Sequence, residues 1–123
     1  MERVTGIGGF FFRSRDPEAL ALWYQERLGV TTVPESYEAG AWRQQENETV
    51  FAPFQQDSEM IGPPEHTWMI NFRVDDLDAI VDQLRAAGET VEVDPRRYRN
   101  GRFAELRDPE GTGIQLWQPM APE

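Results

Sequence analysis

The stretch from Trp68 to Leu84 constrains the fold more than any other, because it predicts a strand that runs directly into a helix. Up to Val74, apolar residues alternate with polar ones, which is the period of a strand with one buried face. Asp76 then suits the cap of a helix, whose apolar positions recur from Leu77 at i, i+3, i+4 and i+7. The chain must therefore bury one face of a sheet against one face of this helix.

The same plan occurs earlier in the chain. Five residues recur after a displacement of sixty, from position 12 to position 72 and onward: Phe12, Arg13, Asp16, Ala19 and Leu20 return as Phe72, Arg73, Asp76, Ala79 and Ile80. Gly29 and Gly88, each suited to end a helix, are separated by almost the same displacement. We therefore expect a duplicated unit rather than one continuous pattern.

Each half is expected to be a βαβββ module. In the first half the pattern predicts a helix after Asp16-Pro17 and strands at 7–14, 30–34, 41–45 and 49–54. In the second half it predicts a helix at 77–87 and strands at 68–74, 90–93, 102–107 and 113–117. The modules span about 5–55 and 66–119, joined by a polar linker at about 55–65, within a single domain over 1–123.

A module of this kind covers only one face of its sheet with its helix, so the other face must meet a partner or enclose a ligand. We expect an α+β fold in which two tandem βαβββ modules form an eight-stranded, curved mixed sheet around a cleft. Alternation along the strands places these residues in the cleft: Gly9, Phe11, Arg13, Met69, Asn71, Arg73, Gln115 and Trp117. It places these against the helices: Phe10, Phe12, Ile70, Phe72, Ile114 and Leu116.

Composition excludes several classes of function. With a formal net charge of −10, the chain is a poor partner for nucleic acid or an anionic membrane, and cationic or neutral ligands are mildly favoured. The sequence has no cysteine, which excludes disulfides, thiolate catalysis and thiolate metal sites. It contains no apolar run of the kind found in signal peptides or membrane spans. We expect a soluble, cytoplasmic protein with no nucleic-acid or membrane partner.

Three motifs, in the order RDPEALALWYQERLG, MINFRVDDLDAIVDQLRAAG and RDPEGTGIQLWQP, extend this expectation to a family. Their arrangement resembles the vicinal oxygen chelate superfamily, which includes glyoxalase I, bleomycin-resistance proteins and extradiol dioxygenases. The resemblance implies a glyoxalase-like fold of paired βαβββ modules, a cleft inside the sheet and, frequently, a homodimer. A homodimer would also remove the hazard of unpaired edge strands.

Enzymes of that superfamily hold a divalent metal with His, Gln or Glu side chains on the strands of the cleft. The matching positions here fall on Gly9, Met69 and Gln115, with a looser match at Phe51. Glycine and phenylalanine have no ligating group, a thioether is a poor ligand for Mg, Mn or Zn, and one amide cannot hold the ion alone. We therefore expect no metal at the family position and no cofactor.

The leading expectation is a glyoxalase/bleomycin-resistance-like protein that binds a small organic molecule in the cleft without the usual metal. The expected ligand-binding residues are Phe11, Arg13, Trp42, Phe51, Met69, Asn71, Arg73, Phe103, Gln115 and Trp117. The alternative is an enzyme of the superfamily (lyase, isomerase or dioxygenase) with a displaced metal site or metal-free acid–base chemistry. Its candidate catalytic residues are Glu105 and His66. A structural dimer without a ligand is a third hypothesis.

Several of these residues also have purely structural interpretations. Arg13 and Arg73 could offer paired guanidinium groups to an anionic ligand, or form ion pairs with acidic neighbours such as Glu48 or Glu105. The aromatic residues could line a ligand cavity or a dimer interface, or pack in the core. His66 follows two prolines, so it suits a surface position as well as a general base. A basic loop expected at the cleft mouth contains Arg96, Arg97, Tyr98, Arg99 and Arg102.

Overall fold

The computed structural model describes residues 1–3, 7–31 and 42–120 of the chain. Its helices are α1 (Pro17–Leu28), the short 3-10 helix η1 (Glu59–Ile61) and α2 (Leu77–Ala86). Its strands are β1 (Ile70–Arg73), β2 (Glu92–Val93), β3 (Arg102–Arg107) and β4 (Gly113–Gln118). The protein therefore has the α+β class that the sequence predicts.

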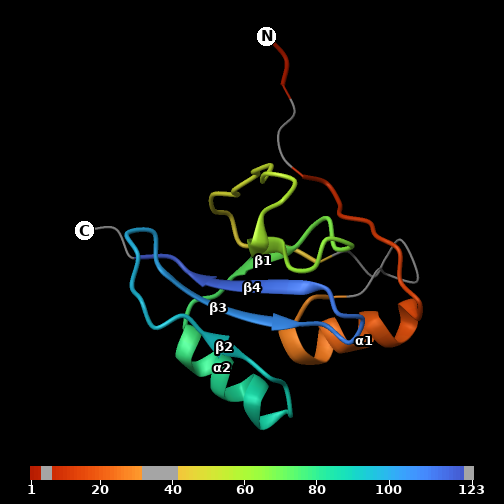
Figure 1. The fold of residues 1–123 in the computed structure, drawn as a ribbon, viewed down its shortest axis with the longest axis vertical. Coiled ribbons are helices and arrows are strands. Elements are labelled where there is room, and N and C mark those ends of the chain that lie inside the picture. Colours follow the sequence, from red (N-terminus) through yellow and green to blue (C-terminus); the bar gives the residue numbers. More distant parts are fainter. Residues whose placement is uncertain (4–6, 32–41, 121–123) are drawn as a thin grey trace.

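Within the described residues the strands form one mixed sheet of four strands, in the order β1-β4-β3-β2. β1 runs parallel to β4, whereas the β3–β4 and β2–β3 pairs are antiparallel. Both α-helices lie on the same face of this sheet, and residues 42–69 lie mostly on the other side (Figure 1). The second half of the chain thus has the strand–helix–three-strand order that the sequence predicts.

One apolar cluster fills the space between the sheet and the helices. Helix α2 contributes Leu77, Val81 and Leu84, which lie on one side of the helix and are almost fully buried. The two central strands contribute Ala104, Leu106, Ile114 and Leu116, and α1 contributes Leu20 and Tyr24. Ile114 and Leu116 therefore face the helices, as alternation along β4 predicts.

The two helices begin in the same way, which reflects the duplicated motif. The carboxylate of Asp16 accepts a hydrogen bond from the Ala19 N–H at 3.2 Å, and that of Asp76 accepts one from Ala79 at 3.0 Å. The end of α1 needs Gly29, because this residue has a left-handed backbone with a φ of 72°. The N-caps Asp16 and Asp76 and the helix end at Gly29 are those that the sequence pattern predicts.

Helix α1 is attached to the second half of the chain by side-chain hydrogen bonds. The hydroxyl of Tyr24 donates to Asp108 at 2.8 Å, and the indole N–H of Trp23 donates to Glu89 at 2.9 Å. At the start of the helix, the backbone N–H of Arg15 donates to Glu110 at 2.7 Å. The turn between β3 and β4, together with Glu89 after α2, therefore fixes where α1 sits on the sheet.

The first half differs from the sequence prediction. Residues 7–14 and 42–54 contain no assigned strand, so the predicted strands at 7–14 and 49–54 and the described part of 41–45 are not formed. Alternating apolar residues indicate a chain that can bury one face, but a strand also needs a hydrogen-bonding neighbour. Phe10 and Phe12 instead pack against Trp68, with ring centroids 5.0 and 5.3 Å from that of Trp68. Most of the strand predicted at 30–34 lies outside the described residues.

The two edge strands of the sheet are shorter than the sequence predicts. β1 covers Ile70–Arg73 rather than 68–74, and β2 covers Glu92–Val93 rather than 90–93. Each has a neighbouring strand on one side only among the described residues, so its ends lack the pairing that would extend it. None of the helices in the described part of the chain is long and apolar enough to cross a membrane.

Candidate functional site

The sheet face opposite α1 and α2, here called the open face, is the candidate site because the strand register arranges its side chains in rows. One row, the aromatic row, consists of Phe103 of β3, Trp117 of β4 and Arg73 of β1. The next row along the strands, the polar row, consists of Glu92, Glu105, Gln115 and Asn71. These residues alternate with the buried ones, which places them on the face that the helices leave uncovered.

Apart from Arg73, the aromatic row presents ring surface rather than polar groups. The rings of Phe103 and Trp117 are nearly parallel, with an interplanar angle of 5° and centroids 6.3 Å apart. Tyr98, from the loop before β3, meets Phe103 edge-on at a centroid distance of 5.8 Å. The indole N–H of Trp117 already donates to the Asn100 carbonyl at 2.6 Å. What the row offers a ligand is therefore flat apolar area, which suits another aromatic ring.

The polar row keeps part of its hydrogen-bonding capacity free. The side-chain amide of Asn71 donates to the Gln115 oxygen at 2.7 Å. This bond leaves the carbonyl oxygen of Asn71 and the amide group of Gln115 without a partner among the described residues. Glu105 is exposed, and its carboxylate makes no hydrogen bond or ion pair with any residue in the described ranges. The row can therefore both donate to and accept from a bound molecule.

Arg73 is occupied by the protein itself. Its guanidinium donates to the backbone carbonyl of Glu48 at 2.6 Å and to that of Gln45 at 3.0 Å. The ion pair with the Glu48 side chain that the sequence suggests is replaced by a bond to the backbone of the same residue. Arg73 therefore holds the segment around residues 45–48 at the β1 edge of the open face, and it is not available as a free anion-binding fork.

Two further predicted residues lie at the opposite end of the strands from the aromatic row. Met69 stands beside Gly113, at the start of β4. His66 is partly buried, and its backbone N–H donates to the Pro63 carbonyl at 2.9 Å. Its ring lies beside Gly111 in the turn before β4. The position of His66 favours a packing role against that turn, away from the aromatic and polar rows.

The structure does not bring the remaining predicted ligand-binding residues to the open face. Phe11 and Phe51 are 90% and 89% exposed, and Arg13 is also exposed. Trp42 packs edge-on against Phe72, whose side chain belongs to the helix-facing set, at a centroid distance of 6.3 Å. The expected inward direction of Phe11 and Arg13 depended on a strand at 7–14 that is not formed here.

The residues at the superfamily's metal positions do not fit a divalent ion. Gly9 has no donor, and the Gln115 oxygen is used by Asn71. Within the described ranges, no group of three or more His, Cys, Asp or Glu side chains lies close enough to hold a metal ion. The residues at these positions therefore do not supply the three or four protein donors that a tight divalent site needs.

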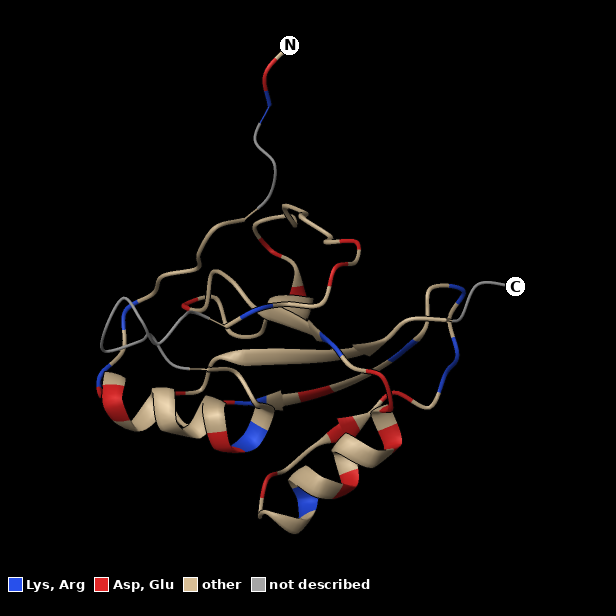
Figure 2. Cartoon of the chain, turned by 180° about the vertical axis from the view of Figure 1, so that it is seen from behind, with Lys and Arg blue, Asp and Glu red and all other residues tan. Residues whose placement is uncertain are grey.

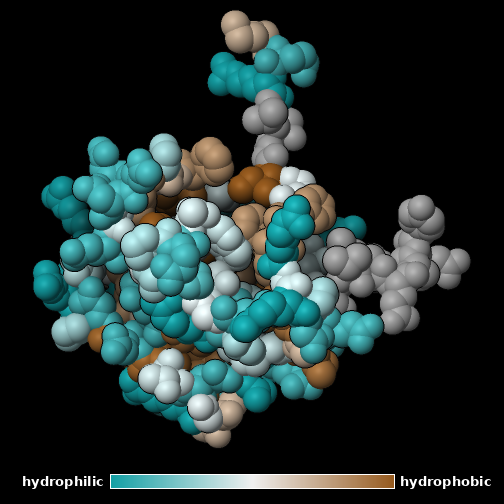
Figure 3. Space-filling model, turned by 45° about the vertical axis from the view of Figure 1, so that its right-hand side comes forward, coloured by the Kyte–Doolittle hydropathy of each residue, from teal (hydrophilic) through white to brown (hydrophobic). Residues whose placement is uncertain are grey.

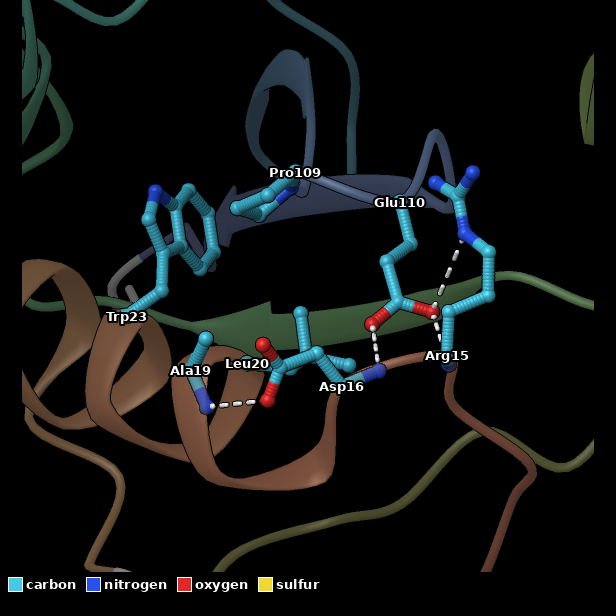
Figure 4. A pocket seen from close by; sticks show the side chains of 7 residues that line it. All are labelled: Arg15, Asp16, Ala19, Leu20, Trp23, Pro109 and Glu110. Carbon is cyan, nitrogen blue, oxygen red and sulfur yellow. Dashed lines mark hydrogen bonds and ion pairs between the residues drawn. The ribbon is translucent and has the colours of Figure 1, made fainter.

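A separate cavity of about 390 Å³ lies between the start of α1 and the turn before β4 (Figure 4). It is lined by Arg15, Asp16, Ala19, Leu20, Trp23, Pro109 and Glu110. Its main polar groups are already in use: Asp16 caps α1, and Glu110 accepts from the backbone N–H groups of Arg15 and Asp16. Hydrogen bonds from Ser14 and from the Arg15 backbone lower the pKa of Glu110. The cavity is therefore best explained as the seam along which α1 is held.

The buried Asp108 completes this seam. One of its oxygens accepts from the N–H groups of Glu110 and Thr112 at 2.8 and 3.0 Å, and the other accepts from Tyr24. Burial and the hydrogen bond to Asp108 raise the pKa of Tyr24 well above its usual range. The sequence identified the segment 108–111 only as a turn. The two acidic residues of this turn, Asp108 and Glu110, are the sequence signal that could have indicated that α1 is attached there.

Sequence comparison gives partial matches to two mycobacterial proteins, both named as candidate glyoxylases and both called CFP32, from Mycobacterium bovis and Mycobacterium tuberculosis. Each is 42% identical over 61 residues, which is 49% of this chain and 23% of the relative. The match thus spans about a quarter of the length of these curated relatives.

Structural comparison finds a likeness along the whole chain. TnmS3, an antibiotic-binding protein from Streptomyces sp. CB03234, is similar with a TM-score of 0.60 and 20% sequence identity. The similarity covers 98% of this chain and 100% of TnmS3, so the two share a fold. The family model of the glyoxalase-like domain matches residues 9–117. The chain therefore belongs to the glyoxalase-like domain family, which is consistent with the resemblance of its motifs to the vicinal oxygen chelate superfamily.

Proposed function

We propose that this protein binds a small, partly aromatic organic molecule on the open face of its sheet. The observation that carries the proposal is the aromatic row beside a polar row with unused hydrogen-bonding groups, on the face that neither α-helix covers. Flat ring surface supplies most of the contact with such a ligand, while a few polar groups fix its orientation. The binding residues are Asn71, Phe103, Gln115 and Trp117.

The comparisons support a binding role. TnmS3 is an antibiotic-binding protein, and this chain shares its fold over nearly its entire length. The likeness makes an antibiotic one reasonable choice in a ligand screen. The proposed binding needs no metal, because hydrogen bonds and ring contacts suffice to hold a small organic molecule. Glu105, with a free carboxylate in the polar row, remains the candidate acid–base residue if a bound compound is converted.

We also propose that the first half of the chain completes the sheet toward eight strands in a cytoplasmic homodimer. Large apolar side chains of this half are exposed, among them Phe11, Val50 and Phe51 at 90, 74 and 89%. Apolar surface is visible where the N-terminal segment meets the body of the protein (Figure 3). A second copy would cover these side chains and pair with β1, which has a neighbouring strand on one side only among the described residues. Light scattering tests this: a single species near 14.2 kDa at micromolar concentrations would contradict the dimer.

A ligand screen by thermal shift, followed by calorimetry, tests the binding proposal. Gln115→Ala removes a polar anchor on the open face, and Gln83→Ala is the matched control because Gln83 lies exposed on α2. We expect Gln115→Ala to cost about 1–3 kcal/mol of binding, roughly ten- to a hundredfold in affinity, for a ligand that uses this anchor. Gln83→Ala should change nothing. Hits that bind both variants and the unmodified protein equally would place the ligand elsewhere.

A further inference from the structure

The loop between β2 and β3, residues 94–101, is here called the arginine loop. Internal hydrogen bonds hold its backbone, while its arginine side chains are exposed. The carboxylate of Asp94 accepts from the Arg96 backbone N–H at 3.0 Å and from the Tyr98 hydroxyl at 2.8 Å. Tyr98 and Gly101 exchange two backbone hydrogen bonds, at 3.0 and 3.1 Å. These bonds fix the tip of the loop, so its side chains start from defined positions.

This loop is docked onto the aromatic row. Tyr98 contacts Phe103, and the carbonyl of Asn100 accepts from the Trp117 indole. Gly101 has a φ of +132°, and a Cβ there would stand 2.2 Å from the backbone oxygen of Gln118. Only glycine allows the loop to approach the end of β4 this closely. The basic residues of the loop are therefore held at one end of the open face.

Three arginines of this loop make no close ion pair among the described residues, although the charge of Arg96 acts on Asp94 and that of Arg97 on Asp78. Arg96, Arg97 and Arg99 are exposed and form no ion pair with any residue in the described ranges. Arg102, by contrast, is paired with Asp78 of α2 at 3.1 Å. Figure 2 shows this loop as a cluster of blue segments at the end of the sheet. In a chain with a net charge of −10, three arginines within four residues form a local excess of positive charge that Asp94 and Asp78 only partly offset.

Negatively charged side chains lie on the other side of the aromatic row from this loop. Glu92 and Glu105 are register neighbours on adjacent strands, so two carboxylates stand side by side on the open face. Like charges at such a position repel each other, and a cation bound between them would relieve the repulsion. The polar row lies four residues along β3 from Gly101, roughly 14 Å at the usual rise per residue. Arg73 and Arg107 also lie on this face, but their guanidinium groups are bonded to backbone carbonyls. The remaining charges of the open face run from the arginines, across the flat rings, to the glutamates.

We propose that the ligand of the open face is a flat aromatic molecule with a negative group at one end and a positive group at the other. This inference rests on the proposed function and adds the charge class and the orientation. The rings would lie on Phe103 and Trp117, with the anion toward the arginine loop and the cation toward Glu92 and Glu105. Guanidinium groups suit a carboxylate particularly well, because their N–H groups match its two oxygens.

Four naphthalene probes that share one ring system test this: 6-(aminomethyl)-2-naphthoate, which carries both charges, 2-naphthoate, 2-naphthylmethylammonium and the neutral 2-naphthamide. Calorimetric titration gives the four affinities. Each correctly placed charge at an exposed site should improve affinity about two- to fivefold, so the doubly charged probe should bind most tightly and the neutral amide most weakly. The advantage should shrink as salt is raised.

Two variants assign the ends. Arg97→Gln combined with Arg99→Gln should weaken the two probes that carry a carboxylate and leave the other two unchanged. Glu105→Gln should weaken the two probes that carry an ammonium group. Arg15→Gln is the control, because its side chain is 80% exposed beside Glu110, at the opposite end of the strands. If the neutral amide binds as tightly as the doubly charged probe, or the variants change all four affinities alike, the charge assignment is wrong although the binding function stands. If no probe binds, the proposed binding on this face fails as well.

Discussion

The bond between Tyr24 and Asp108 is expected to be a major support of the first half of the chain. Tyr24→Phe removes only the hydroxyl and keeps the ring that packs in the core. One carboxylate oxygen of Asp108 then loses its hydrogen bond from Tyr24, while Asp108 itself stays 5% exposed. A buried acceptor left without a donor costs about 1–3 kcal/mol, and a charged acceptor belongs at the upper end of that range. We expect Tyr24→Phe to lower the free energy of unfolding by about 3 kcal/mol.

The measurement is equilibrium unfolding in urea, followed by tryptophan fluorescence, with the midpoint and slope fitted together. Tyr98→Phe is the matched control, because its hydroxyl also donates to an aspartate at 2.8 Å but at the protein surface. The control should leave the midpoint almost unchanged, since water can replace that donor. Equal midpoints for Tyr24→Phe and Tyr98→Phe would refute the view that the buried bond holds α1 on the sheet.

Three further predictions follow from the same contacts. Because the raised pKa of Tyr24 stabilises the fold only while the hydroxyl is protonated, stability should decline as the pH rises above about 10, the unfolded value, and Tyr24→Phe should flatten that decline in urea titrations. The lowered pKa of Glu110 contributes stability above about pH 4.5 that is lost on acidification, so Glu110→Gln should reduce the difference in unfolding midpoint between pH 6 and pH 3. Gly101→Ala should displace the arginine loop, seen as a changed Trp117 indole N–H resonance in NMR spectra, whereas an unchanged resonance would mean that the loop tolerates a side chain.

The sequence predicted the second half of the fold well because its elements are determined locally. Each element can be recognised from a few adjacent residues: the alternation up to Val74, the cap at Asp76 and the turn at Asp108. The structure contains the corresponding strand, helix and turn. Register then followed from parity alone, so that Asn71, Gln115 and Trp117 share the open face as expected.

The first half was harder to predict from the sequence, because a strand forms only beside a hydrogen-bonding neighbour, and alternation of apolar residues does not specify that neighbour. Phe11 and Phe12 occupy consecutive positions that suit a strand, yet they lie 90% and 43% exposed in a segment without strand pairing. The role of Arg73 was also unpredictable, since its partners are backbone carbonyls, and any residue can supply those. The charge pattern of the open face emerged only when the register placed Glu92 beside Glu105.

The most direct test of binding on the open face compares two tryptophan side chains in one NMR experiment. The indole N–H of Trp117 reports on the aromatic row, and that of Trp23 reports on the cavity beside α1. In a titration of ¹⁵N-labelled protein with a hit from the ligand screen, binding on the open face predicts a progressive shift of the Trp117 resonance, together with shifts of the Asn71 and Gln115 side-chain amides, while Trp23 stays in place. A shift of Trp23 with Trp117 unmoved would contradict it and locate binding in the seam of α1.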